Sequence, residues 1–230
     1  RGLLTAIGKA HGTKPPTPED LAAYVYALLS APAYQARFEV ALQTPGLRVP
    51  LTADADLWRE AVELGAWLLW LHTYAERFQG PGRGRFVPTV PGLGWTSPVR
   101  TMPETAKQID YNAATQELHV GDGVVGGVRP EVWEFSVSGM PVVKKWLGYR
   151  TAKGAGKAAS SKNELDRIRP SAWPDEWNDE LLDLLRVLTL SCDRHGEQED
   201  LLDRICAGPL LAPSDLPKPK AAERKPPVKE

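Results

Sequence analysis

A run of helix-breaking residues constrains the fold of this 230-residue chain more than any other feature. Four of the six positions from Gly80 to Arg85 are Gly or Pro, and a helix cannot continue through them. Before the run, apolar residues recur at spacings of three and four; after it, short β-like segments alternate with Gly and Pro. We therefore predict an α+β fold with a helical N-terminal unit, a β-rich, mostly antiparallel centre and a C-terminal helical pair.

The N-terminal part carries the signals of three helices, after a lead-in over residues 1–16 that we expect to be irregular. Thr17 is suited to cap the first helix, because Pro18 and two acidic residues follow it. A second helix is predicted to begin at Pro32 and to run through Leu42, and a third to run from about Ala55 to Phe78. Their apolar faces predict a small helical unit.

The centre of the chain contains five short segments that resemble strands in composition. These segments are Phe86–Val90, Ile109–Asn112, Gln116–Val120, Val124–Val128 and Val132–Val137. Asn112-Ala113-Ala114 and Gly121-Asp122-Gly123 are predicted hairpin turns between them. Gly121, Gly123 and Gly126 have the spacing of a dinucleotide-binding fingerprint, but they lie between hairpin strands instead of between a strand and a long helix. We interpret them as part of a tight turn.

The stretch from Pro130 to Arg150 is predicted to be a strand that passes through a turn into a short helix. The apolar residues Trp133, Phe135 and Val137 occupy every second position, which is the period of a strand with one buried face, up to a break at Ser138-Gly139. A helix is then predicted to begin at Pro141, with apolar residues at helical spacing.

Two further helices are predicted near the C-terminus. One follows Trp173-Pro174, and the other runs from Glu199 to Cys206. Residues 212–230 form a polar tail that we expect to be disordered.

Charge is unevenly distributed along the chain, although the net charge is only −1. The window from Met140 to Pro170 has eight Lys or Arg and two acids, a net charge of +6, whereas the window from Asp175 to Asp203 is net −8. Cations beside small residues favour a DNA or RNA backbone as partner, and the alternative is a solvated linker without one. The candidate contacts are Arg83, Arg85, Arg100, Lys144, Lys145, Arg150, Lys153, Lys157 and Lys162. The aromatic residues among them are more typical of a core than of base stacking.

No catalytic constellation is evident in the sequence. The four histidines occur in unrelated contexts, without Cys or carboxylate at the spacing of zinc ligands. Asp110-Tyr111-Asn112 is not the Asx-Pro-Pro-aromatic signature with which adenine methyltransferases hold an extruded base. We therefore expect no catalytic residue, metal or cofactor in this chain.

The remaining features bear on the cellular setting. Cys192 and Cys206 are expected to be reduced, buried thiols of a cytoplasmic protein. No apolar run reaches 18 residues, so we expect no membrane span. The chain begins Arg1-Gly2, and we interpret it as a piece of a longer protein.

Two groups of motifs resemble a known family. Thr17 to Tyr34, Arg48-Val49-Pro50 and Leu64-Gly65 to Leu71-His72 are similar to the segment that follows the methyltransferase in large single-chain restriction-modification enzymes. Gly127-Val128 to Tyr149-Arg150 resembles the core of their target-recognition domain. The nearest resemblance is to the C-terminal specificity domain of type ISP enzymes, with the type IIG and IIL enzymes as the alternative.

This resemblance implies sequence-specific recognition of double-stranded DNA for cleavage and methylation. Residues 1–79 would be a helical connector after the methyltransferase, and residues 80–211 the target-recognition domain. The nuclease, the helicase or translocase and the N6-adenine methyltransferase would lie in the preceding part of the polypeptide, with S-adenosylmethionine, ATP and Mg as their cofactors. The alternative function is a helical module that docks those domains without reading DNA.

Overall fold

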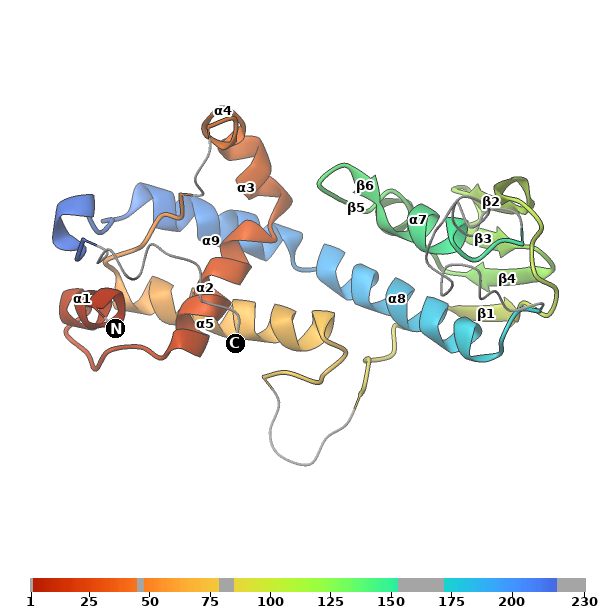
Figure 1. The fold of residues 1–230 in the computed structure, drawn as a ribbon, viewed down its shortest axis with the longest axis horizontal. Helices are drawn as coiled ribbons and strands as arrows, with labels where there is room; N and C mark the ends of the chain where they lie inside the picture. Colours follow the sequence, from red (N-terminus) through yellow and green to blue (C-terminus); the bar gives the residue numbers. More distant parts are fainter. Residues whose placement is uncertain (1, 45–47, 79–84, 153–171, 219–230) are drawn as a thin grey trace, which may run out of the picture. The chain divides into compact units, whose positions relative to one another are not determined.

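The computed structural model describes residues 2–44, 48–78, 85–152 and 172–218 (Figure 1). The chain divides into two compact units. The helical unit contains residues 1–84 and 194–230, and the β-rich unit contains residues 85–193. The α+β class predicted from the sequence is confirmed. Of the predicted C-terminal helical pair, α8 (Glu176–Cys192) belongs to the β-rich unit and α9 (His195–Ala207) to the helical unit.

The helical unit is built on the crossing of α2 (Pro18–Leu29) and α5 (Ala55–His72). Thr17 caps α2 as predicted: its hydroxyl accepts from the Asp20 N–H at 3.1 Å, and its own N–H donates to the Asp20 carboxylate at 2.8 Å. Tyr24 of α2 stacks on Trp58 of α5 with ring centres 4.3 Å apart. Leu201, Leu202 and Ile205 of α9 are buried in the same core.

The remaining elements of the helical unit are short. They are α1 (Gly2–Ala10), α3 (Pro32–Arg37), α4 (Glu39–Leu42) and the 3-10 helix η3 (Pro213–Asp215). The expected irregular lead-in was wrong, because residues 2–10 form α1 and Ile7 is buried in the core. The third predicted helix also ends earlier than expected, at His72, since Tyr74 and Ala75 adopt positive φ values of 53° and 63°.

The β-rich unit contains a four-stranded antiparallel sheet in the order β1-β4-β3-β2. The strands are β1 (Gly94–Ser97), β2 (Ile109–Asn112), β3 (Glu117–Val120) and β4 (Gly123–Gly126), and the 3-10 helix η1 (Ala106–Gln108) precedes β2. The predicted tight turn is confirmed between β3 and β4, where Gly121 has φ 59°. The strand predicted at Phe86–Val90 was wrong, and the first strand of the sheet is β1.

The segment after the sheet departs from the predicted strand Val132–Val137. It forms a helical turn, α6 (Pro130–Trp133), and then a hairpin of β5 (Ser136–Val137) and β6 (Met140–Pro141). Pro130 supplies the first position of α6, and the Trp133 N–H donates to the Arg129 carbonyl. Six alternating residues fit a strand, but such a short pattern cannot exclude one helical turn. The predicted helix after Pro141 is present as α7 (Val142–Gly148).

A buried amide joins α8 to the chain around β1. The Asn178 Oδ1 accepts from the Val99 N–H at 3.2 Å and from the Trp173 Nε1–H at 3.1 Å, while its Nδ2 donates to the Val99 carbonyl at 3.1 Å. The Trp95 Nε1–H donates to the Asn178 carbonyl at 3.2 Å. Leu181, Leu185 and the buried side chains of the sheet share one hydrophobic core. Val132 of α6 and Val143 and Leu147 of α7 belong to this core.

Candidate functional site

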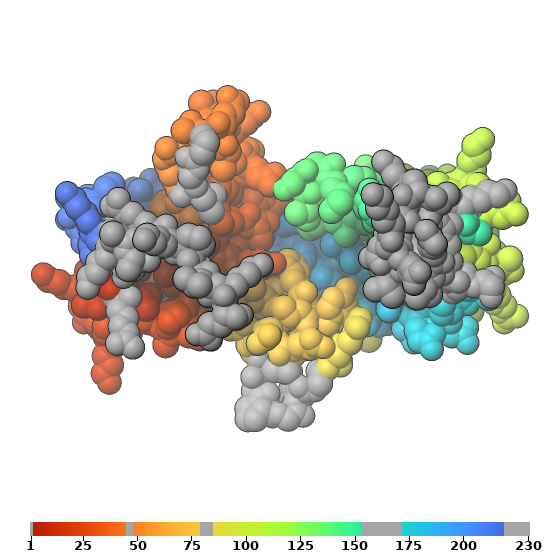
Figure 2. Space-filling model, in the orientation of Figure 1, coloured from red at the N-terminus to blue at the C-terminus, as the bar shows by residue number. Residues whose placement is uncertain are grey.

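The candidate site is built on α7 and the hairpin that precedes it. Val143 and Leu147 of α7 are buried, and Val142 and Trp146 pack against the same core, so the two lysines of the helix lie on its outer side. The green segment that contains α7 and the hairpin lies at the surface in Figure 2. Lys144, Lys145 and Arg150, predicted as cationic contacts, therefore come from one short element and its end.

Lys144 is held by a carboxylate. Its Nζ donates to both oxygens of Glu134, at 2.7 and 2.8 Å, and lies 4.9 Å from the centre of the Trp133 ring. Both side chains remain partly exposed, so the pair contributes little to stability. The Glu134 carboxylate nevertheless neutralises the Lys144 charge at this point of the surface.

Arg150 forms a clamp between α7 and α8. Its guanidinium carbon lies 3.6 Å from the centre of the Trp146 ring and 5.0 Å from that of Trp177. Nη1 donates to the Trp146 carbonyl at 3.2 Å, and Nη2 lies 3.4 Å from Glu180. Burial lowers the pKa of Arg150, and the Glu180 carboxylate opposes this shift. The geometry thus gives Arg150 a packing role, and its contact with a phosphate stays a prediction.

Lys145 faces solvent on the outer side of α7. Its Nζ lies 5.0 Å from the centre of the Tyr149 ring, and Tyr149 is itself exposed. In the part of the chain that the structure describes, no carboxylate forms an ion pair with Lys145. An exposed ammonium beside an exposed ring can contact an anionic partner without first breaking an ion pair.

The loop arginines differ in their surroundings. Arg100 is exposed, and the Asp122 carboxylate positions its loop by accepting from the backbone N–H groups of Arg100 and Thr101 at 2.9 and 3.0 Å. These hydrogen bonds lower the pKa of Asp122. The half-exposed Arg85 side chain lies 3.9 Å from Asp183.

The other four predicted contacts lie outside the described residues: Arg83, Lys153, Lys157 and Lys162. Two exposed apolar residues, Val137 and Met140, flank the hairpin turn and were not among the predicted contacts. The available signal was Ser138-Gly139 between two apolar residues, which is a two-residue hairpin pattern.

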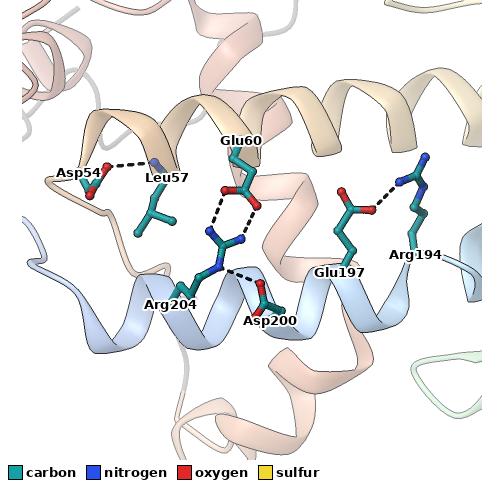
Figure 3. A network of polar contacts seen from close by, with 7 residues as sticks. All are labelled: Asp54, Leu57, Glu60, Arg194, Glu197, Asp200 and Arg204. Carbon is teal, nitrogen blue, oxygen red and sulfur yellow. Dashed lines mark hydrogen bonds and ion pairs between the residues drawn. The ribbon is translucent and has the colours of Figure 1, made fainter.

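Several arginines of the helical unit lie in ion pairs, as Figure 3 shows for α5 and α9. Arg204 of α9 binds both carboxylate oxygens of Glu60 on α5 and also contacts Asp200 at 2.8 Å. These hydrogen bonds lower the pKa of Glu60. Arg194 pairs with Glu197 at 2.5 Å. These cations serve helix packing, so positive charge alone does not identify a binding surface.

Within the described ranges, no group of three His, Cys, Asp or Glu side chains is arranged to hold a metal ion. Cys192 and Cys206 are unpaired and partly buried, and burial raises the pKa of Cys192 to about 11. No helix among the described residues is long and apolar enough to cross a membrane.

A comparison with known protein families matches most of the chain. The sequence profile described as the type ISP C-terminal specificity domain matches residues 1–184. A cryoEM structure of a DrdV-DNA complex has a similar fold, with a TM-score of 0.55, 17% identity, and coverage of 90% of this chain and 19% of that one. A nuclease-deletion mutant of the type ISP restriction-modification enzyme LlaGI, in complex with a DNA substrate mimic, gives a TM-score of 0.49 and 17% identity, with coverage of 82% and 14%. The chain therefore spans about a fifth or less of these proteins. No curated protein matches the sequence.

Proposed function

The chain belongs to the family of type ISP C-terminal specificity domains, and we propose that it recognises the DNA target of a restriction-modification enzyme. The observation that carries this proposal is the family match over residues 1–184, which includes the sheet, the hairpin, α7 and the start of α8. A specificity domain must hold the duplex through its phosphates and distinguish bases in a groove.

The exposed cations of the β-rich unit support a division between these two tasks. Lys145 would contact the phosphate backbone from α7, where it faces no described carboxylate. Arg100 stands on a loop held by Asp122, and an arginine on such a loop can reach a base edge in the major groove. Lys144 and Arg150 would contribute less, because Glu134 and the aromatic clamp already engage them.

The activities of the whole enzyme are a wider part of the proposal. The preceding part of the polypeptide would carry an N6-adenine methyltransferase that uses S-adenosylmethionine, a helicase or translocase that uses ATP and Mg, and a nuclease. This chain would direct all of them to one duplex sequence. Its partners would then be double-stranded DNA and the methyltransferase and motor domains of the same polypeptide.

A docking module without DNA recognition is the second candidate function. One observation favours it: Val40 and Leu42 on the short helix α4 are exposed by 80% and 43%. Apolar residues grouped in this way suit a protein surface better than a phosphate chain. Co-purification of the chain with the preceding domains, without a footprint on DNA, would support this function.

Binding to duplex DNA at rising salt tests the proposal. The full chain is titrated into random-sequence duplex, and bound sequences are then selected and sequenced. We expect the logarithm of affinity to fall linearly with the logarithm of salt concentration, and the bound pool to become enriched in one sequence. Absence of binding at low salt would reject DNA recognition.

Single substitutions test the division of tasks. Lys145→Ala is expected to weaken binding to all sequences alike and to reduce the salt slope by about 0.9, the value for one phosphate contact. Arg100→Ala is expected to change which sequences are enriched. Lys14→Ala removes one charge from an exposed loop of the helical unit and serves as the matched control. Identical effects of all three substitutions would contradict this division.

A further inference from the structure

The β5–β6 hairpin is a narrow ribbon with a well-defined tip. Val137 pairs with Met140, and Ser136 with Pro141. The two connecting residues, Ser138 and Gly139, have positive φ values of 51° and 75°. Positive φ at both central positions is the geometry of a type I′ turn, whose twist matches that of the strands it joins. The turn therefore holds Val137 and Met140 in a fixed register.

The hairpin presents one small apolar face. Residues directly opposite each other in an antiparallel pair lie on the same face, with Cβ atoms about 5 Å apart. Val137 and Met140 are such a pair, and they are exposed by 52% and 48%. No described atom would lie within 4 Å of a Cβ added at Gly139, so the tip is open on its turn side. The Val137 and Met140 side chains thus form a small exposed apolar face at the tip of the hairpin.

The base of the hairpin is anchored to the core. The Val142 N–H donates to the Phe135 carbonyl at 2.9 Å, and α7 begins at Val142, directly after β6. Val132 on one side of the hairpin and Val143 on the other are fully buried. The ribbon is therefore held before any partner arrives, and little ordering entropy opposes its contacts.

One exposed cation near the hairpin favours a polyanion over another apolar surface. Lys145 of α7, the helix that continues from β6, and Tyr149, directly after α7, face solvent, and Lys145 has no carboxylate in ion-pair range among the described residues. A two-stranded ribbon fits the major groove of duplex DNA, where the thymine C5-methyl is an apolar group on the groove floor. The minor groove offers no such methyl group.

We propose that the hairpin enters the major groove and that Val137 and Met140 contact thymine methyl groups of the target, with Lys145 on the neighbouring phosphates. This inference rests on the proposed function of duplex DNA recognition and deepens it by naming the residues and the chemical group that they read. The contact is a burial of apolar surface and needs no hydrogen bond from the tip.

Replacing thymine by uracil tests this contact, because uracil lacks only the methyl group. The enriched duplex from the random selection is remade with deoxyuridine at each thymine in turn, and binding of the full chain is measured. We expect affinity to fall about fourfold at one or two positions, the effect of burying one methyl-sized group. In Val137→Ser/Met140→Gln, which removes the methyl groups of residue 137 and places an amide at residue 140, uracil and thymine should bind equally at those positions.

The design separates failure of the inference from failure of the proposed function. Val40→Ser on α4 is the control, because it makes the same change at an exposed position of the helical unit. Retention of the thymine preference by the double variant, or an enriched sequence without thymine dependence, would overturn the hairpin contact while leaving DNA recognition in place. Failure to enrich any sequence would overturn the proposed function itself. Each single variant, Val137→Ser and Met140→Gln, repeats the measurement with a smaller structural change.

Discussion

The two units place their charged and polar groups differently. In the helical unit, α2 and α5 approach closely at Gly65, and arginines such as Arg204 and Arg37 pair with carboxylates on the surface. In the β-rich unit, the buried Asn178 and the partly buried Arg150 contact aromatic rings, while Lys145 and Arg100 remain exposed. The same types of cationic residue therefore serve two roles. Those beside carboxylates or aromatic rings stabilise the packing, whereas those exposed without a carboxylate partner are available to a binding partner.

The largest expected effect comes from filling the helix crossing of the helical unit. A Cβ at Gly65 would lie 1.8 Å from the Ala23 carbonyl oxygen. Gly65→Ala should therefore lower the free energy of unfolding by about 3 kcal/mol or more, overriding the gain of about 1 kcal/mol that Ala brings to an open helix site. Thermal or urea unfolding measures this change in the free energy of unfolding. Gly196→Ala on α9, where the Cβ meets nothing, is the control and should stabilise; equal effects at both sites would refute the close approach.

The next largest effect is expected in the interior of the β-rich unit. Asn178→Ala leaves the Val99 N–H and carbonyl and the Trp173 Nε1–H without their buried partner. We expect a loss of about 2 to 3 kcal/mol in the free energy of unfolding. Asn112→Ala, at an exposed turn, is the matched control and should cost less than about 1 kcal/mol. Similar losses would mean that the Asn178 network does not hold the unit together.

A smaller effect on stability is expected to distinguish Arg150, which contacts two tryptophan rings, from Lys145 on the exposed face of α7. Arg150→Ala removes the contacts with Trp146 and Trp177 and should destabilise the β-rich unit by about 1 to 2 kcal/mol. Arg150→Lys should recover only part of this, because an ammonium cannot stack as a planar guanidinium does. Lys145→Ala should leave stability within about 0.5 kcal/mol while weakening DNA binding. If the Arg150 and Lys145 variants unfold alike, the two cations do not differ in role.

The smallest effect is a pH dependence of the helical unit. Burial, and then the nearby His195, lower the pKa of His72, whose Nδ1 lies 2.7 Å from the Tyr26 hydroxyl. As pH falls, the unfolded chain binds this proton at a pKa near 6.5, whereas the folded chain binds it only at lower pH. The free energy of unfolding should therefore be highest above pH 6.5 and decrease as pH drops below it. His72→Asn should flatten this fall in urea unfolding at several pH values. Burial also lowers the pKa of His195, so His195→Asn should flatten it too. An unchanged slope in His72→Asn would exclude His72 as a source.

Much of the fold could be predicted because its signals are local. The capping box at Thr17, the turn at Gly121 and the boundaries of β2 depend on residues only a few positions apart. The early end of α5 could not be predicted, because Tyr74 and Ala75 are ordinary residues that adopt positive φ there. The hairpin was missed because its strands have two residues each, too few to show a period.

The sequence alone determined the fold class, the family resemblance and a set of candidate cations. Only the tertiary structure decided which of the described cations face solvent. Lys145 and Arg150 belong to one basic stretch, yet Trp177 and Glu180 reach Arg150 from up to 30 residues away along the chain. Those contacts exist only because the shared core brings α7 and α8 together. Burial and pairing of a charge depend on such distant neighbours, whereas helix caps and turns depend on adjacent residues.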